Sequence, residues 1–300
     1  MRQNYIVVVP CFNLVLLSMR HLLAVALLLL ANPLLAFGDN TIAWQTYHRP
    51  PGIIKTGAHD GQGFVQKSLD LIIKELPEYQ HEMPLTTLAR SLSDMKAGRF
   101  VCHPALFKTA EREKFMYFSQ ASMINPTSRI VAHDKKIEPL VRNGAVDLAQ
   151  LLQQANMTFA LVKGRSYTQP IDDILAQYLN KNVLFEMTST DLEPLFKMVA
   201  LGRIDVTIAY PFEVNYYIKN SPVTALALNV YAIAGMAQFS FGSVACPKNE
   251  WGKQIIEQVN TALKALKPKE EYKRAVTTWW EGERDNPQFE AFYQDVFLRN

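Results

Sequence analysis

The sequence has few of the residue patterns that mark the common catalytic and metal-binding classes. It contains three cysteines and six histidines in 300 residues, and no two histidines stand at a His-x-x-x-His spacing. It also has no Gly-x-Ser-x-Gly nucleophile motif, no Gly-x-x-x-x-Gly-Lys phosphate loop, no repeats and no low-complexity tract. These absences argue against a zinc hydrolase, an α/β-hydrolase and a nucleotide-binding domain. We therefore expect no cofactor and no metal.

The charge balance is close to neutral. The whole chain carries a formal net charge of +3, and removal of residues 1–36, which contain Arg2 and Arg20 but no acid, leaves +1. Nucleic-acid binding requires a strong cationic excess on one face, because most of the affinity comes from phosphate contacts. The composition therefore predicts a protein without a nucleic-acid partner.

The N-terminal segment has the three parts of a secretory leader. Met19-Arg20-His21 is a basic start, Leu22–Leu30 is an apolar run, and Leu34-Leu35-Ala36 offers a small residue for cleavage. This order predicts a signal peptide over residues 1–36, with Met19 as a candidate for the true start. A retained membrane anchor is the alternative interpretation. The signal peptide predicts a periplasmic, secreted protein.

Two cysteines remain after such a cleavage, Cys102 and Cys246. Disulfides persist in oxidising compartments outside the cytoplasm. From the residues alone, the two can either pair or remain as two separate buried thiols.

Strand-like and helix-like segments alternate along the rest of the chain, which is typical of α/β architecture. The expected strands are 41–44, 100–102, 158–162, 183–185, 203–209 and 241–247, and the expected helices begin near Gly63, Thr87, Pro170, Asp191 and just after Pro247. Apolar residues recur at helical spacing in each expected helix. Gly98 and Gly202 stand where the second and fourth of these helices should end.

Arg112 is the first candidate binding residue. It lies in the stretch Thr109-Ala110-Glu111-Arg112, at an expected strand-to-helix turn. A guanidinium group offers a rigid fork of donors that can hold a carboxylate through two parallel hydrogen bonds. Thr109, three residues earlier, has the right spacing to cap the turn. The alternative interpretation of Arg112 is an ordinary solvated surface charge.

Several short motifs occur together in a recognisable order. They are Pro50-Pro51, Gly61-x-Gly63-Phe64, Leu92–Gly98, Thr109-x-x-Arg112 with Phe118-Ser119, Gly164–Ser166, Gly202-Arg203-Ile204-Asp205 and a closing helix near Trp279-Trp280. On these motifs the chain resembles extracellular solute-binding proteins of family 3, the group related to the amino-acid-binding components of ABC importers. The resemblance covers residues 40–280.

The resemblance implies the type II periplasmic-binding fold, with two α/β lobes joined by two crossing strands and a cleft between them. The first lobe would comprise residues 37–126 plus 241–300, and the second lobe residues 127–240. A small-molecule ligand would be captured by hinge closure and presented to an ABC permease or a membrane sensor. We expect a monomer.

The resemblance also assigns roles to individual residues. The arginine that matches Arg112 holds the ligand's carboxylate, and the turn Gly164-Arg165-Ser166 supplies donors at a helix N-terminus, which favours anions. Arg165 and Ser166 are therefore candidate ligand contacts. The strand that carries Cys102 would neighbour the strand that carries Cys246, which implies a disulfide between them.

The sequence departs from the family pattern where an amino acid's ammonium would bind. Tyr210 and Thr46 stand where the family has acids, and Ala105 and Phe107 replace residues that are often hydroxyl-bearing. We therefore expect a more aromatic cleft, whose candidate walls are Trp44, Tyr47, Phe107 and Tyr210. Ordinary core packing is the competing interpretation for these aromatic residues. His103 is the histidine nearest the expected cleft.

An enzyme on the same scaffold is the alternative function. Some relatives resemble dehydratases, which use a cleft carboxylate as a general acid or base. Glu213, three residues beyond Tyr210, is the first candidate for that role, and a solvated surface glutamate is the competing interpretation. Asp60 and Glu213 are also the acids that could reach the cleft and pair with an ammonium.

Overall fold

The computed structural model of the chain describes residues 40–133, 136–154, 156–178, 184–187, 191–220, 228–281 and 284–300. The predicted signal peptide, residues 1–36, lies outside the described residues. Residues Thr41–Asn300 form one compact unit, which is described below. Among the described residues, none of the helices has the length and apolar character needed to span a lipid bilayer.

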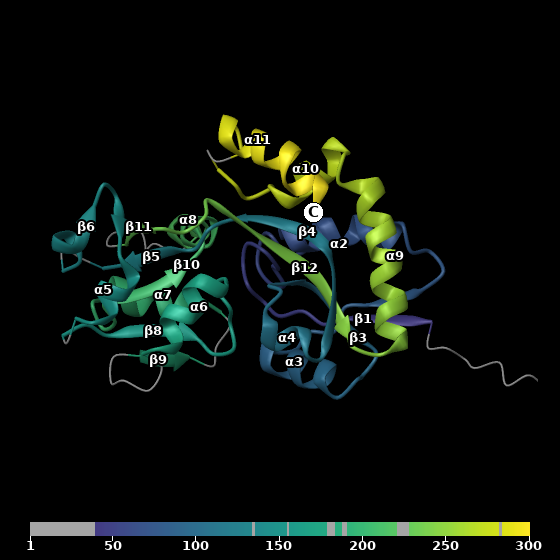
Figure 1. The fold of residues 1–300 in the computed structure, drawn as a ribbon, viewed down its shortest axis with the longest axis horizontal. Helices are drawn as coiled ribbons and strands as arrows, with labels where there is room; N and C mark the ends of the chain where they lie inside the picture. The colour runs from purple at the N-terminus through teal and green to yellow at the C-terminus, as the bar shows by residue number, and fades with distance from the viewer. Residues whose placement is uncertain are drawn as a thin grey trace, which may run out of the picture. The chain divides into compact units, whose positions relative to one another are not determined.

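The described strands form two sheets (Figure 1). The first has the order β2-β1-β3-β12-β4, and its strands are β1 (Thr41–Trp44), β2 (Gln80–Glu82), β3 (Val101–Leu106), β4 (Met116–Pro126) and β12 (Phe239–Pro247). Strand β1 runs parallel to β2 and β3, whereas β12 runs antiparallel to both β3 and β4.

The second sheet has the order β6-β7-β11-β5-β10-β8-β9. Its strands are β5 (Arg129–Ala132), β6 (Val141–Arg142), β7 (Ala145–Val146), β8 (Phe159–Val162), β9 (Leu184–Met187), β10 (Val206–Ala209) and β11 (Asn229–Ile233). Strand β10 is parallel to β8 and antiparallel to β5. The two sheets, with helices between their strands, have the α/β architecture of the type II periplasmic-binding fold.

The chain passes between the sheets through two paired strands. β4 and β12 lie side by side over their length, from Phe239 opposite Pro126 to Pro247 opposite Met116 (Figure 1). Two residues separate β4 from β5, and five residues separate β11 from β12. The lobe boundaries at residues 126 and 240 stay a prediction.

Helices pack on both sheets. Those that contribute to the core around the first sheet are α2 (Phe64–Lys74), α3 (Leu88–Lys96), α9 (Glu250–Leu266), α10 (Glu270–Val276) and α11 (Pro287–Asp295). Those that follow strands of the second sheet are α5 (Leu148–Leu152), α6 (Gln169–Ala176), α7 (Glu193–Ala200) and α8 (Pro211–Asn220). The short α4 (Ala110–Glu113) connects β3 to β4, and the 3-10 turns are η1 (Glu138–Leu140) and η2 (Phe297–Arg299).

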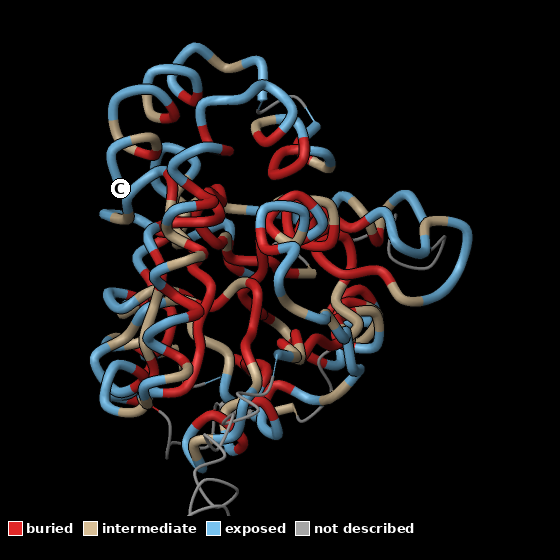
Figure 2. The backbone as a smooth tube through the Cα atoms, turned by 90° about the vertical axis from the view of Figure 1, so that its right-hand side faces the viewer, coloured by how far each residue is buried: buried red, intermediate tan, exposed pale blue. Residues whose placement is uncertain are grey.

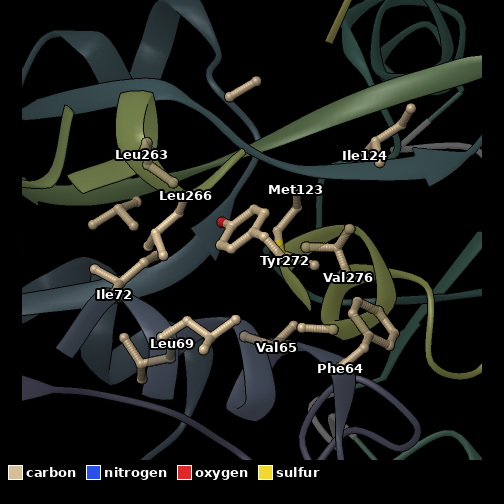
Figure 3. Packing of buried hydrophobic residues seen from close by; sticks show 14 of the residues in the cluster. Phe64, Val65, Leu69, Ile72, Met123, Ile124, Leu263, Leu266, Tyr272 and Val276 are labelled. Carbon is tan, nitrogen blue, oxygen red and sulfur yellow. The ribbon is translucent and has the colours of Figure 1, made fainter. Parts of the chain in front are cut away.

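Apolar faces of these elements meet in one large cluster beside the first sheet. Figure 3 shows Leu69 and Ile72 of α2, Leu263 of α9, Met123 of β4 and Tyr272 of α10 gathered together. The Tyr272 hydroxyl donates to the carbonyl of Ser122 at 2.8 Å, so this polar group is satisfied inside the core. Figure 2 shows the same layering along the backbone, with buried segments inside and exposed helix faces outside.

Local signals placed several helices correctly. Thr87 caps α3 by accepting from the Arg90 N–H, and Gly98 follows the helix with φ +73°, a left-handed conformation that glycine adopts without strain. Gly202 follows α7 with φ +65°. The helix expected after Pro247 is α9, which ends at Leu266, and a separate closing helix, α10, ends at Val276, just before Trp279 and Trp280.

Cys102 of β3 and Cys246 of β12 are joined in the structure, with their sulfur atoms 2.02 Å apart and their Cα atoms 4.4 Å apart. Both residues are fully buried in the core of the first sheet. The bond links a central strand of the sheet to the strand that returns from the second sheet.

We expect the Cys102→Ala/Cys246→Ala double variant to lose about 4–5 kcal/mol of unfolding free energy. The physical reason is the large loop, since the two cysteines are 144 residues apart in the sequence. Urea unfolding of the oxidised and double-variant proteins measures the difference. Two free thiols in the wild-type protein, titrated after denaturation without reductant, would contradict the pairing.

Candidate functional site

Strand β3 and helix α4 position Arg112. Thr109 Oγ1 accepts from the Arg112 N–H at 3.3 Å, so the capping predicted from the sequence is confirmed. The cap fixes the first turn of α4 directly after β3, and this turn directs the Arg112 side chain inward, where it is 8 % exposed. The surface-charge interpretation of Arg112 is therefore wrong.

The Arg112 guanidinium contacts segments from both sheets. Nη1 donates to the Phe107 carbonyl at 2.9 Å, and Nη2 donates to the Gly164 carbonyl at 3.1 Å. Gly164 follows β8 of the second sheet. Burial lowers the pKa of Arg112, yet a guanidinium remains protonated in proteins, so the site keeps a permanent positive charge here.

Arg165 forms a buried ion pair with Glu213. Arg165 Nη2 lies 2.7 Å from Glu213 Oε2, and the two side chains are 5 % and 1 % exposed. Burial acts to lower the pKa of Arg165, but the neighbouring Glu213 carboxylate, Tyr167 and Tyr210 together outweigh it and the net shift is upward. Nη1 of Arg165 is buried and has no hydrogen-bond partner among the described residues.

Glu213 is held in place by two further contacts. It is the third residue of α8, and its Oε2 also accepts from the Tyr210 N–H at 3.0 Å, which satisfies a free donor at the start of the helix. Its Oε1 lies 3.7 Å from Nε of Arg49. The solvated-surface interpretation of Glu213 is therefore wrong, because this carboxylate is buried between two guanidinium groups.

A cavity of about 40 Å³ lies among these groups. Arg112, Arg165, Ser166, Tyr47, Phe107 and Tyr210, all predicted as ligand contacts, line it together with Arg49, Phe64, Val65, Leu88, Ala105, Leu106, Met123, Asn125 and Gly242. A single water needs about 10–15 Å³ of such space. The cavity therefore holds a few waters, and an organic solute can enter only if the walls move.

The aromatic walls surround the charged groups. The Phe107 and Tyr210 rings lie 6.5 Å apart, and the Arg165 guanidinium lies 5.2 Å from the centre of the Tyr210 ring. Burial raises the pKa of the Tyr210 hydroxyl, so this group is neutral at physiological pH. Ala105 also lines the cavity, at one of the positions where the sequence departs from the family pattern.

Trp44 does not line the cavity, so its prediction as a cleft wall is corrected. The side chain is fully buried in the core of the first sheet, and its Nε1 donates to His81 Nδ1 at 3.0 Å. The final residue of β1 points into the core, whereas Tyr47, three residues later, reaches the cavity.

The turn after β8 does not lie at a helix N-terminus, where the resemblance placed it. Helix α6 begins at Gln169, three residues beyond Ser166, so the turn is not the N-terminus of that helix. The N–H groups of Arg165 and Tyr167 donate to Val162 O and Asp172 Oδ1, and the Ser166 hydroxyl donates to Asp172 Oδ2. The turn contributes the Arg165 side chain and the Gly164 carbonyl instead.

Other candidates lie outside the cavity wall. His103 is buried behind it, with its ring 5.7 Å from the Tyr47 ring, and Asp60 is exposed. The part of the chain that the structure describes contains no cluster of three metal-ligating side chains.

Arg49 and Asn125 are cavity residues that sequence reasoning missed. Arg49 stands in the stretch after β1, next to the conspicuous Pro50-Pro51. The available signal in the sequence was a cationic residue, Arg49, in the loop after the first strand, where a ligand contact can lie. Its pairing with Glu213, 164 residues away, has no local signature.

The comparisons with known proteins agree with this architecture. The model of the bacterial extracellular solute-binding proteins, family 3, matches residues 41–282. No curated protein sequence matches the chain.

Solved structures match the fold at low sequence identity. An amino acid ABC transporter substrate-binding protein from Streptococcus pneumoniae, bound to L-arginine, has 18 % identity and a TM-score of 0.62, with 84 % of this chain and 98 % of that chain covered. A histidine kinase sensor domain similar to periplasmic binding proteins has 15 % identity and a TM-score of 0.61, covering 80 % and 96 %.

A third structure is an ancestral amino acid-binding protein described as a precursor of cyclohexadienyl dehydratase. It has 19 % identity and a TM-score of 0.61, with 82 % of this chain and 97 % of that chain covered. At such identities the likeness supports the fold alone.

The buried His103 should make stability depend on pH. Burial and the charges of Arg49 and Arg112 lower its pKa to about 3, whereas an unfolded histidine has a pKa of about 6.5. Between these values the unfolded chain binds a proton that the native state excludes. The contribution is therefore complete above about pH 6.5 and is lost as the pH falls, by up to about 1.4 kcal/mol per pH unit.

Urea unfolding between about pH 7 and pH 5 measures this slope in the wild type and in His103→Gln, which keeps an acceptor for the Ala105 N–H. The difference between the two slopes isolates His103, and His133→Gln serves as the control. Equal slopes in wild type and His103→Gln would contradict the assignment.

Proposed function

We propose that this chain, which belongs to the bacterial extracellular solute-binding proteins of family 3, captures a small carboxylate-bearing solute in the cavity beside Arg112. The observation that carries the proposal is the charge of the cavity wall. Its charged members are Arg49, Arg112 and Arg165, and no Asp or Glu stands among the described residues that line it. A desolvated wall of guanidinium groups favours an anion.

The position of Arg112 supports its role as the carboxylate anchor. In the structure its guanidinium donates to two backbone carbonyls, that of Phe107 after β3 and that of Gly164 after β8. A carboxylate is a stronger acceptor than a neutral carbonyl and fits the guanidinium fork with two parallel bonds. A solute that enters the cavity would exchange these neutral contacts for charged ones, and so would favour a closed arrangement of the walls.

Capture followed by delivery fits the family. Members are extracellular or periplasmic proteins that bind small molecules, and the structural neighbours include a transporter component and a sensor domain. We propose a periplasmic monomer that presents its solute to a permease or a membrane sensor after the two lobes close around it.

A dehydratase-like activity is less well supported. Glu213, the carboxylate first considered for acid or base chemistry, is bound to Arg165 and to the Tyr210 N–H and does not line the cavity. A general acid or base needs access to the substrate. An ion-paired carboxylate behind the wall lacks that access, so we propose binding without turnover.

Arg112→Gln should weaken binding of the best organic acid found in a thermal-shift screen by about 2–5 kcal/mol, because the carboxylate loses its charged partner. Calorimetry measures the affinity, and the unfolding temperature of the variant shows that it remains folded. Arg203→Gln removes an exposed arginine outside the cavity and is the control. Unchanged affinity in Arg112→Gln would refute the anchor role.

Ordinary α-amino acids should bind weakly or not at all. Their ammonium group needs an acid, because an unpaired buried charge costs several kcal/mol, and Tyr210 offers only a neutral hydroxyl. Calorimetry against the twenty common amino acids tests this expectation. Micromolar affinity for any of them would contradict this expectation, whereas a gain of such binding in Tyr210→Asp would support it.

A further inference from the structure

The cavity wall carries more positive charge than one carboxylate can neutralise. Three guanidinium groups line it, and Glu213, the carboxylate that pairs with Arg165 and Arg49, lies behind Arg165. Glu213 Oε2 already accepts from Arg165 and from the Tyr210 N–H. A single carboxylate on Arg112 would therefore leave Arg49 with only its 3.7 Å contact to Glu213.

The Arg49 guanidinium has N–H donors without a described hydrogen-bond acceptor. Its side chain is 18 % exposed, and the structure describes no hydrogen bond made by its guanidinium, only the ion pair with Glu213 Oε1. Glu213 Oε1 likewise lacks a hydrogen-bond partner among the described residues. The Arg49 guanidinium lies 5.8 Å from the centre of the Tyr47 ring, another cavity residue. Its fork is therefore open to a second acceptor inside the cavity.

Asp172 is the next acid to consider as a counter-charge. Its carboxylate accepts from the Ser166 hydroxyl at 2.5 Å and from the Tyr167 N–H at 2.8 Å. It faces a neighbouring groove and does not line the cavity. It shapes the turn that carries Arg165, and its charge acts on Arg112 from the side of that groove, so it does not reach Arg49.

The charges of Arg49 and Arg112 both reach His103, so the two side chains lie close to the same part of the structure. His103 of β3 has its pKa lowered by burial and by the charges of both arginines. Both side chains also line the cavity, one from the loop after β1 and the other from α4. The two guanidinium groups thus approach the same cavity from two different segments of the first sheet.

We infer that the solute is a small dicarboxylate without an ammonium group, with one carboxylate on Arg112 and the other on Arg49. This inference rests on the proposed function and specifies its ligand class. Arg165 stays paired with Glu213 and lends its free Nη1 as an additional donor. The aromatic residues Tyr47, Phe107 and Tyr210 enclose the carbon skeleton between the two charged ends.

The test compares diacids with their own monoamides, which keep the shape and lose one charge. Succinate, glutarate, adipate and isophthalate are titrated by calorimetry beside succinamate, glutaramate, adipamate and isophthalamate. We expect at least one diacid to bind tenfold or more tightly than its monoamide. In Arg49→Gln this preference should fall to within threefold, because the diacid loses more affinity than its monoamide.

Arg49→Lys and Arg203→Gln complete the series. Arg49→Lys keeps a cation beside Glu213 and should retain part of the preference, whereas Arg203→Gln should retain all of it. Unfolding temperatures verify that each variant is folded. A full preference that persists in Arg49→Gln would overturn the inference.

The remaining outcomes separate the inference from the proposed function. If the monoamides bind as tightly as the diacids, the inference that the ligand is a dicarboxylate is wrong. The proposed function, binding of a carboxylate-bearing solute, would still hold. If inorganic phosphate or phenyl phosphate binds more tightly than every diacid, the dicarboxylate inference is wrong and the ligand class is a phosphate. If no acid of either series binds, the proposed function fails and the inference fails with it.

Discussion

The burial of guanidinium groups between two sheets is the constraint on which the rest of this structure depends. Arg165 is almost fully enclosed, and so is the Glu213 carboxylate that neutralises it. A buried charge without a partner is strongly destabilising, so the position of α8, which carries Glu213, is coupled to that of the turn after β8. The same network fixes Tyr210, whose N–H is bound by Glu213.

The specificity that we propose for the cavity comes from the charges that this network leaves unpaired. Glu213 neutralises one guanidinium, and the other arginines of the wall, Arg49 and Arg112, keep charge that water can solvate only in part. A solute that supplies the missing negative charge is stabilised by groups that the fold has already oriented. This pre-orientation reduces the entropic cost of binding, because the protein side chains are ordered before the solute arrives.

Residues with local signatures were predicted well from the sequence. Thr87 and Gly98 bound α3 through capping and a left-handed turn, and Thr109 caps the turn that carries Arg112, so neighbouring residues sufficed. The long strand β4 and strand β11 were missed. Their partners are distant in sequence, and hydrophobic spacing within one segment does not reveal them.

The site was predicted in part, for the same physical reason. Tyr47, Phe107, Arg112, Arg165, Ser166 and Tyr210 meet at one cavity. Trp44 packs in the core instead. The sequence could not show this, because an aromatic residue at the end of a strand is compatible with both a core position and a cavity wall. Arg49 was missed and Glu213 was expected at the surface, because only the fold brings them within 3.7 Å of each other.

The most direct measurement is mass spectrometry of the small molecules released when the protein, purified without added ligand, is denatured. A cationic cavity wall without an acid predicts an organic acid that carries carboxylates and no amine, present in wild type and depleted in Arg112→Gln. Recovery of an amino acid or an organic cation in stoichiometric amount from the wild type would contradict the account.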